Sequence, residues 1–180
     1  IDICFIPMIF MINCFPVDIQ GKLFISPFEY YNTNNTFSRQ NIKNNKPQLT
    51  VGILGTPVER KNYKEVIKIC NNNKIKIILH CSYFHSSNME EEFKNLSNTN
   101  DFFELSTDKY NEEEMVNFWN KIDIYIFPSS GEGYSKTVRE AIYNEKVCII
   151  SDIPAHYNII NTKLIKKINT SKGYINYSIN

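Results

Sequence analysis

Two loops of the sequence carry residue types that can bind a phosphorylated ligand. The first runs Pro128-Ser-Ser-Gly-Glu-Gly-Tyr-Ser-Lys-Thr-Val-Arg-Glu140 and is expected to connect a strand to a helix. Free backbone N–H groups at that helix start, around residues 135–138, favour an anion such as phosphate. Gly131 and Gly133 let the backbone approach a ligand closely. Glu132 stands in the loop, and Glu140 lies one turn into the helix.

The second loop, Gly55-Thr-Pro-Val-Glu-Arg-Lys61, follows an earlier strand. Arg60 and Lys61 are expected to begin the next helix, where basic side chains oppose the helix dipole at a cost of about 0.3–1 kcal/mol. An anion nearby would offset that cost. If both loops lie on one edge of a sheet, together they favour a diphosphate ligand.

Each feature of these loops also has a purely structural explanation. Ser135 can be an N-cap, and Thr137 with Glu140 has the spacing of a capping box. The glycines can simply make a turn, and the basic pair can be a solvated surface pair. Taken singly, the loops therefore leave the choice between a ligand site and ordinary connections open.

The elements that must position these loops alternate along the chain. Continuous apolar runs predict strands at residues 49–54, 75–81, 101–105, 123–127 and 147–150. Helical spacing predicts helices at residues 61–72, 89–96, 111–122 and 135–143, with Trp119 in the core. Continuous strands buried on both faces indicate an α/β fold, a Rossmann-like doubly wound parallel sheet between helices. In such sheets the ligand lies beyond the carboxyl ends of the strands.

Composition narrows the class of protein. The 180 residues include 20 basic and 19 acidic ones, a balance that gives no case for a nucleic-acid partner. Five cysteines without a C-x-x-C pair indicate buried free thiols in a reducing compartment rather than a disulfide framework. Glu112, Glu113 and Glu114 fit the first turn of a helix, and no metal site is expected.

The start of the chain reads as strand and turn. IDICFIPMIFMINCFPV is apolar, but Asp2, Pro7, Asn13 and Pro16 interrupt it and no basic segment precedes it, unlike a signal peptide or membrane span. Residues 31–47 are polar and predict a surface loop or linker. We therefore expect residues 1–48 to be the end of a preceding domain with a linker, and residues 49–180 to form one Rossmann-like domain.

The first loop and its flanks resemble a known family. Residues 123–155, DIYIFPSSGEGYSKTVREAIYNEKVCIISDIPA, are similar to the donor-binding, C-terminal half of the retaining GT-B glycosyltransferases, the family four group in particular. That group has a strand ending in Pro-Ser, two variable residues, Glu-Gly-aromatic and a second Glu eight positions after the first. The matching residues are Pro128, Ser129, Glu132, Gly133, Tyr134 and Glu140.

The second loop extends this resemblance to residues 51–155. VGILGTPVERKN resembles the family's first strand and diphosphate loop, with Lys61 at the usual lysine position. FPVD, residues 15–18, is similar to the hinge before this domain. The sequence departs from the family at Thr56, where Arg is usual and Arg60 is the candidate substitute, and at Asn62, where Gly is usual. Ser135 replaces a common Gly, and Lys136 with Thr137 replaces Leu-Pro.

The resemblance implies roles for these residues. Glu132 would contact hydroxyls of the donor sugar, Glu140 would contact the ribose, and Lys61 with the amides near residues 134–137 would stabilise the departing diphosphate without a metal. It therefore implies Glu132 and Lys61 as catalytic residues. The substrate-binding residues that it implies are Gly55, Thr56, Arg60, Gly133, Tyr134, Ser135, Lys136, Thr137 and Glu140.

The resemblance implies that residues 49–180 form the donor-binding domain of a glycosyltransferase. This domain would bind a nucleotide-diphosphate sugar and would need no cofactor. Its acceptor, a glycan, lipid or protein, would be held by an N-terminal domain that residues 1–48 are too short to build. The implied location is cytoplasmic, or peripheral to a membrane. One alternative is a degenerate, non-catalytic nucleotide-sugar-binding or assembly module, which Thr56 motivates. Another is a different GT-B enzyme such as a nucleotide-sugar epimerase, against which the Glu132–Glu140 spacing argues.

The histidines of the chain are expected to be surface or packing residues. His80, at the end of the second predicted strand, could approach a nucleotide, but for it and for His85 we expect a surface or partly packed side chain. His156 follows Pro154 without an acidic or cysteine partner at metal-ligand spacing, and no site role is expected for it.

Overall fold

The computed structural model describes residues 4–6, 23–25, 48–156, 159 and 165–168, which form one main sheet and a small second one. The predicted linker at residues 31–47 and the hinge-like residues 15–18 lie outside this part. The strands are β1 (Cys4–Ile6), β2 (Leu23–Ile25), β3 (Thr50–Leu54), β4 (Lys76–His80), β5 (Phe103–Ser106), β6 (Ile124–Phe127), β7 (Val147–Ser151) and β8 (Ile165–Ile168). The helices are α2 (Tyr63–Asn72), α3 (Ser87–Thr99), α4 (Glu112–Lys121) and α5 (Lys136–Tyr143), with 3-10 turns η2 (Glu59–Lys61) and η3 (Pro154–His156).

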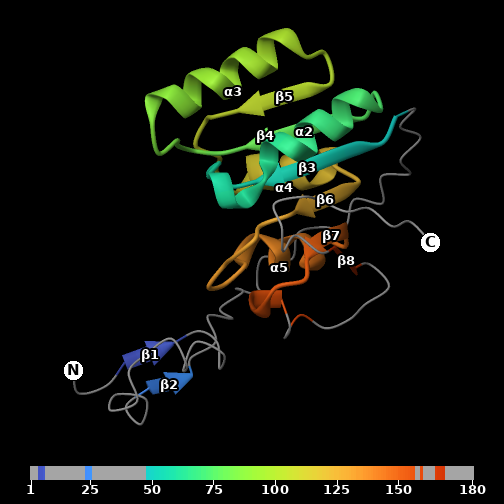
Figure 1. Ribbon diagram of the computed structural model, residues 1–180. Coiled ribbons are helices and arrows are strands. Elements are labelled where there is room, and N and C mark those ends of the chain that lie inside the picture. Colours follow the sequence, from blue (N-terminus) through green and yellow to red (C-terminus); the bar gives the residue numbers. More distant parts are fainter. Residues whose placement is uncertain (1–3, 7–22, 26–47, 157–158, 160–164, 169–180) are drawn as a thin grey trace.

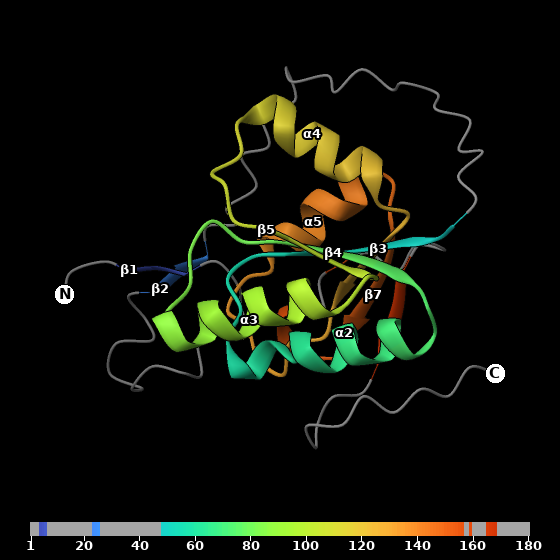
Figure 2. The same ribbon diagram turned by 90° about the horizontal axis from the view of Figure 1, so that it is seen from above.

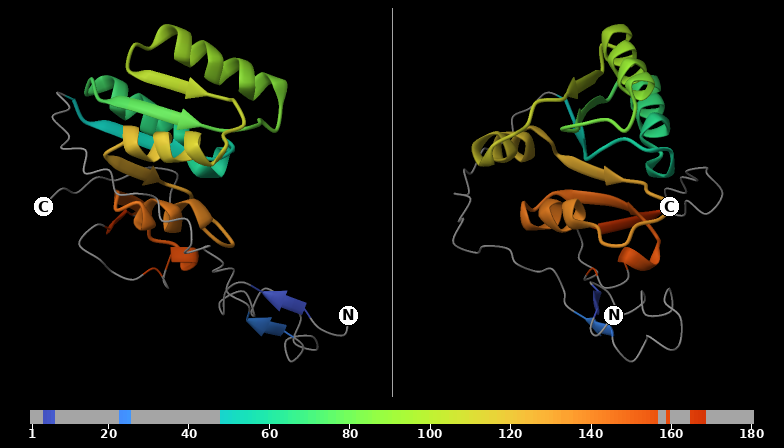
Figure 3. Two further views of the ribbon diagram at one scale, coloured as in Figure 1. Left: turned by 180° about the vertical axis from the view of Figure 1, so that it is seen from behind. Right: turned by 90° about the vertical axis from the view of Figure 1, so that its left-hand side faces the viewer.

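Six strands form the main sheet in the order β5-β4-β3-β6-β7-β8, and every neighbouring pair is parallel (Figure 1). β1 and β2 pair in parallel as a separate sheet. Helices α2 and α3 cover one face of the main sheet, and α4 and α5 cover the other (Figures 2 and 3). The predicted doubly wound parallel α/β fold is confirmed.

The two faces of the sheet have separate apolar cores. On the α2–α3 face, Val51 and Ile53 of β3 pack with Tyr63, Ile67 and Phe93. On the α4–α5 face, β6 and β7 contribute to a second cluster. Its largest members are Phe118, Trp119, Tyr125 and Phe127. Trp119 is buried, as predicted, and neighbouring residues of one strand point to opposite cores because side chains alternate along a strand.

The strand order reverses between β3 and β6. The chain runs outward from β3 through β4 to β5 and then returns to place β6 on the other side of β3. The register pairs Val51 with Ile124 and Gly52 with Tyr125. At the start of β3, Thr50 N donates to Asp123 Oδ2 at 2.8 Å, and Asp123 N donates to Thr50 O at 2.9 Å. The loops after β3 and β6 therefore leave the same edge, where such folds bind ligands.

The expectation of buried free thiols is confirmed for the three cysteines whose side chains the structure describes. Cys70, Cys81 and Cys148 are free and buried, and the side chains of Cys4 and Cys14 lie outside the described part of the chain. Burial raises the pKa of the Cys70 thiol to about 11 and the pKa values of Cys81 and Cys148 to about 12. Since the thiolate is the reactive form, these three cysteines are packing residues.

The acidic run before Met115 is a helix start. Asn111 caps α4 by accepting from Glu114 N at 3.0 Å, and Glu114 accepts from Asn111 N at 2.8 Å. This is a capping box with Glu112 and Glu113 in the first turn, where the helix dipole favours acids. In the described ranges, no three His, Cys, Asp or Glu side chains are grouped closely enough to bind a metal ion.

One strand of the main sheet was not predicted from the sequence. This strand is β8, whose Ile-Lys-Lys-Ile sequence lacks the continuous apolar run of the inner strands. It lies beside β7 at the end of the strand order, where exposed lysines are acceptable.

None of the helices formed by the described residues combines the length and apolarity needed to cross a bilayer.

Gly52 gives a test of the β3–β6 packing. A Cβ at this position would lie 2.4 Å from Ile122 Cδ1 and 2.8 Å from Ile122 Cγ2, and Ile122 is fully buried. We expect Gly52→Ala to lower the free energy of unfolding by about 1–3 kcal/mol through overpacking, measured by urea denaturation. Gly131→Ala is the matched control, because a Cβ there meets nothing within 4 Å. Equal stability of the two variants would contradict this packing.

Candidate functional site

The loop after β3 meets the loop after β6 at the ligand edge of the sheet. Arg60 and Lys61 lie in the 3-10 turn η2, and Asn62, with a left-handed φ of 53°, separates this turn from α2. The expectation that Arg60 and Lys61 begin the next helix is therefore wrong. The basic side chains do not oppose the dipole of α2, so that part of the argument for an anion falls away.

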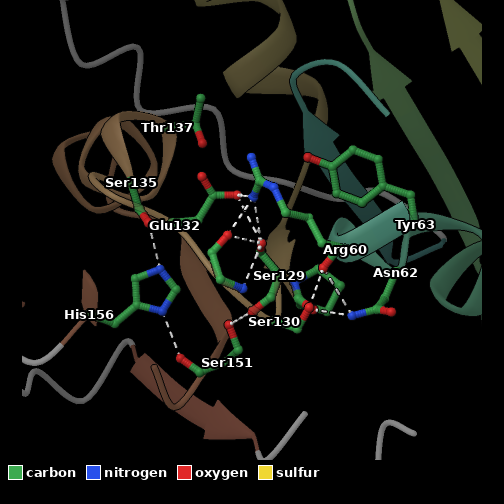
Figure 4. Close-up of polar contacts among 12 residues, drawn as sticks. Arg60, Asn62, Tyr63, Ser129, Ser130, Glu132, Ser135, Thr137, Ser151 and His156 are labelled. Carbon is green, nitrogen blue, oxygen red and sulfur yellow. Dashed lines mark hydrogen bonds and ion pairs between the residues drawn. The ribbon is translucent and has the colours of Figure 1, made fainter. Parts of the chain in front are cut away.

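Arg60 joins the two loops. Its Nη1 donates to Ser129 Oγ at 3.1 Å and to Gly131 O, and it forms an ion pair with Glu132 (Figure 4). The carbonyl of Arg60 accepts from Ser130 N at 2.8 Å and from Ser130 Oγ at 3.0 Å. Residues 128–135 form the β6–α5 loop. Arg60, which was expected to contact a phosphate in place of Thr56, instead contacts this loop.

Asn62 adds a second connection between the loops. Its Nδ2 donates to Pro128 O at 2.8 Å (Figure 4). The resemblance led us to expect Gly where Asn62 stands, and the left-handed backbone at this position also accepts Asn. The side chain that departs from the family pattern therefore fixes the start of the β6–α5 loop.

Glu132 is the carboxylate at the centre of the site. Its side chain is only 12% exposed, and Oε1 accepts from Ser129 Oγ at 2.8 Å in addition to its contact with Arg60. The two partners hold the carboxylate at the ligand edge of the sheet. The structure thus brings together two predicted site residues, Arg60 and Glu132, that are far apart in the sequence.

Lys61 is a cation that is partly removed from water. Its Nζ lies 5.7 Å from the centre of the Tyr63 ring and 5.8 Å from that of Phe127. Burial lowers the pKa of Lys61, and Glu132 opposes this shift. Gly55 has a φ of 112°, and a Cβ there would come within 3.3 Å of Lys61 Nζ. Glycine at this position therefore serves both the turn and the placement of the lysine.

The start of α5 is built differently from the capping motifs considered for it. Ser135 occupies the N-cap position but makes no side-chain cap, because its Oγ is hydrogen-bonded to His156 Nε2 at 2.7 Å. Thr137 and Glu140 both lie inside α5, so they do not form a capping box. Instead, Tyr125 Oη donates to Thr137 Oγ1 at 2.7 Å. The Ser135 hydroxyl is therefore engaged by His156 and does not cap α5.

The remaining predicted residues lie around this helix start. Glu140 is partly buried, and burial raises the pKa of its carboxyl, while Lys136, with its Nζ at 3.6 Å, opposes the rise. The guanidinium of Arg139 lies 4.9 Å from the centre of the Tyr134 ring. Gly133 is exposed, and Thr56 is half-buried in the β3–η2 connection.

His80 and His156 are both buried. The expectation of a surface or partly packed His80 is therefore wrong. Its ring stacks on Tyr110 with centroids 3.6 Å apart, and Nδ1 lies 3.3 Å from Ser106 Oγ. His156 has no exposed surface and contacts Ser135 and Ser151. Burial lowers the pKa of both imidazoles.

Sequence reasoning missed several residues that shape the site. Asn62, Ser129, Ser151 and His156 all contact the β6–α5 loop or lie in it. Ser129 belongs to the quoted motif, and that was the only signal available for it as a site residue. Asn62, Ser151 and His156 act on partners between 21 and 66 positions away, which spacing within a motif cannot reveal.

Comparison with known proteins bears on this geometry. A family model described as glycosyl transferases group 1 matches residues 34–168. No curated protein sequence matches the chain. Solved structures with similar folds include the catalytic domain of starch synthase IV from Arabidopsis thaliana bound to ADP and acarbose, at 17% identity and a TM-score of 0.56. That match covers 69% of this chain and 28% of the other.

Two further structures have the same fold. The C-terminal domain of a group 1 family glycosyl transferase from Francisella tularensis is 16% identical, with a TM-score of 0.53 and 63% of each chain covered. A UDP-forming α,α-trehalose-phosphate synthase from Burkholderia xenovorans is 7% identical, with a TM-score of 0.55, covering 68% of this chain and 34% of the other. This chain thus spans between 28% and 63% of the length of these three proteins.

These structural likenesses establish the fold, which is that of the C-terminal, Rossmann-like domain of GT-B proteins. The family model covers well over half of the 180 residues and includes both loops of the site. The chain therefore belongs to the glycosyl transferases group 1 family.

Proposed function

We propose that this chain is the donor-binding domain of a retaining glycosyltransferase and that it binds a nucleotide-diphosphate sugar. The observation that carries the proposal is the convergence of Lys61, Glu132 and the start of α5 at the edge between β3 and β6. A cation partly removed from water and a helix N-terminus are together suited to a diphosphate. The acceptor would be a glycan, lipid or protein.

The chemistry follows from where charge develops. When the bond between the sugar and the diphosphate breaks, negative charge grows on the leaving phosphate. Lys61 and the N–H groups at the start of α5 would stabilise that charge without rearranging, so the reaction would need no metal ion or other cofactor. Glu132 would accept hydrogen bonds from hydroxyls of the sugar, and Glu140 from those of the ribose.

One observation favours a second function, that of a non-catalytic binding module. Arg60 forms an ion pair with Glu132, the residue proposed to receive the sugar. If a donor cannot displace Arg60, the domain binds the nucleotide and ignores the sugar. If it can, the guanidinium is released next to the diphosphate and supplies the contact that Thr56 does not. The two functions therefore differ in the affinity for a sugar-bearing donor over that for the bare nucleotide.

Nucleotide binding tests the proposal directly. We expect the 180-residue chain to bind at least one of UDP, GDP and ADP in titration calorimetry, with equal affinity in the presence and absence of magnesium. Lys61→Ala should weaken that binding by about 1–3 kcal/mol through loss of a charge-assisted contact. Lys64→Ala is the matched control, since Lys64 carries the same charge and pairs with Glu92 on the surface.

Two results of this titration would reject the donor site. One is the absence of binding to all three nucleotides by a folded sample. The other is an equal loss of affinity in Lys61→Ala and Lys64→Ala, which would reflect net charge alone.

The two glutamates give a second, independent test. Glu140→Gln should weaken binding of the bare nucleotide by about 1–2 kcal/mol and leave the melting temperature nearly unchanged, because a neutral acceptor replaces a charged one. Glu132→Gln should spare the bare nucleotide and weaken only the nucleotide sugar. The measurement compares both variants with wild type against UDP and UDP-glucose, or the corresponding pair for whichever base binds.

The pattern separates the two functions. Selective loss of sugar-dependent affinity in Glu132→Gln supports the transferase domain. Equal affinity of wild type for nucleotide and nucleotide sugar, unchanged in Glu132→Gln, supports the binding module instead. Wild-type behaviour of both variants toward both ligands would mean that the carboxylates serve only the structure of the loop.

A further inference from the structure

The two ends of the β6–α5 loop are held by side chains from the last residue of β7 and from η3. Ser151 Oγ donates to Ser129 O near the start of the loop. His156 Nε2 lies 2.7 Å from Ser135 Oγ at the end of the loop. His156 Nδ1 lies 2.6 Å from Ser151 O, which links the two attachments into one chain of hydrogen bonds (Figure 4). Glu132 lies between the two held ends.

The direction of each hydrogen bond follows from the chemistry of the groups. A backbone carbonyl can only accept, so His156 Nδ1 carries the hydrogen that bonds to Ser151 O. In the neutral imidazole, Nε2 is then an acceptor, and the Ser135 hydroxyl must donate to it. Burial lowers the pKa of His156 and so favours this neutral form. The tautomer of the ring is thereby set by Ser151, and the orientation of the Ser135 hydroxyl is set by the ring.

This chain of bonds is shielded from water along its whole length. Ser129, Ser151 and His156 have no exposed surface, and Ser135 is 3% exposed. Phe127, whose ring also packs near Lys61 Nζ, lies against the imidazole with centroids 6.0 Å apart. Breaking one bond would leave a buried donor or acceptor unsatisfied, which is costly. The ends of the loop are therefore attached far more firmly than an exposed contact such as that of Arg60 could achieve.

We propose that His156 is a positioning residue of the donor site, acting through Ser135 to fix the β6–α5 loop in the geometry that receives the donor. Its ring has no exposed surface, so a ligand bound at the loop would not contact it directly. It sets where Glu132 and the first N–H groups of α5 stand, because both are attached to the loop that it closes. The proposal rests on the proposed function for its ligand, but the attachment of the loop is a property of the ligand-free protein.

Matched substitutions separate the two nitrogens of the ring. His156→Asn keeps a donor near the position of Nδ1 for Ser151 O and removes the contact with Ser135. His156→Gln places an amide oxygen near the position of Nε2, where it can accept from Ser135. We expect His156→Asn to weaken binding of the nucleotide by about tenfold, His156→Gln to restore most of the affinity, and Ser135→Ala to match His156→Asn.

The double variant shows whether His156 acts through Ser135. If it does, His156→Asn/Ser135→Ala should bind no more weakly than either single variant, because the same contact is already lost. Multiplying losses of about tenfold each would overturn that route. Phe103→Leu controls for stability. Phe103 lies in β5, the edge strand opposite β8, and packs in the core on the α2–α3 face of the sheet. We expect this substitution to destabilise the fold and keep the wild-type affinity.

Hydrogen exchange of the ligand-free protein separates failure of this inference from failure of the proposed function. We expect amides of residues 129–135 to exchange at least tenfold faster in His156→Asn, with α2 and β4 unchanged. If wild type binds none of the three nucleotides, the proposed function fails, and faster exchange still supports the attachment of the loop by His156. Unchanged exchange at residues 129–135 together with wild-type affinity in His156→Asn would overturn the positioning role.

Discussion

The parallel pairing of β3 with β6 is the constraint on which the site depends, because it sets which two loops share an edge of the sheet. Hydrogen bonds between Thr50 and Asp123 fix one end of the pair, and Gly52 lets Ile122 pack directly against β3. At the other end, Arg60 reaches Glu132 across 72 positions of sequence. A fold that separated β3 from β6 by another strand would leave both loops intact and their side chains out of contact.

The two basic side chains at this edge, Lys61 and Arg60, are held in different ways. Lys61 is partly buried against Tyr63 and Phe127, so its position is set by packing. Arg60 has a side chain that is 48% exposed, whereas that of its partner Glu132 is 12% exposed. A ligand that displaces Arg60 must therefore supply hydrogen-bond donors of its own to the Glu132 carboxylate. The loop that carries Glu132 does not depend on that ion pair, because the buried bonds of Ser151 and His156 hold its ends.

The parts of this structure that could be predicted are those encoded by neighbouring residues. Apolar runs gave five strands of the main sheet, and helical spacing placed Trp119 and Tyr63 in the core. β8 was missed because an edge strand needs no continuous apolar run. The roles of Ser135 and His156 were missed for a different reason. A serine before a helix predicts a cap, and only the tertiary approach of η3 diverts its hydroxyl to the imidazole.

The position of β3 in the sheet also bears on how the protein is made. Thr50 pairs with Lys76, but its contact with Asp123 spans 73 positions, so one edge of β3 waits for a partner that is synthesised much later. At about 5–20 residues per second, the wait is roughly 4–15 s on the ribosome. During that interval β3 presents unpaired N–H and C=O groups of the kind that associate with other chains. The nascent polypeptide thus exposes a strand edge that adjoins the place where the finished protein is proposed to bind its ligand.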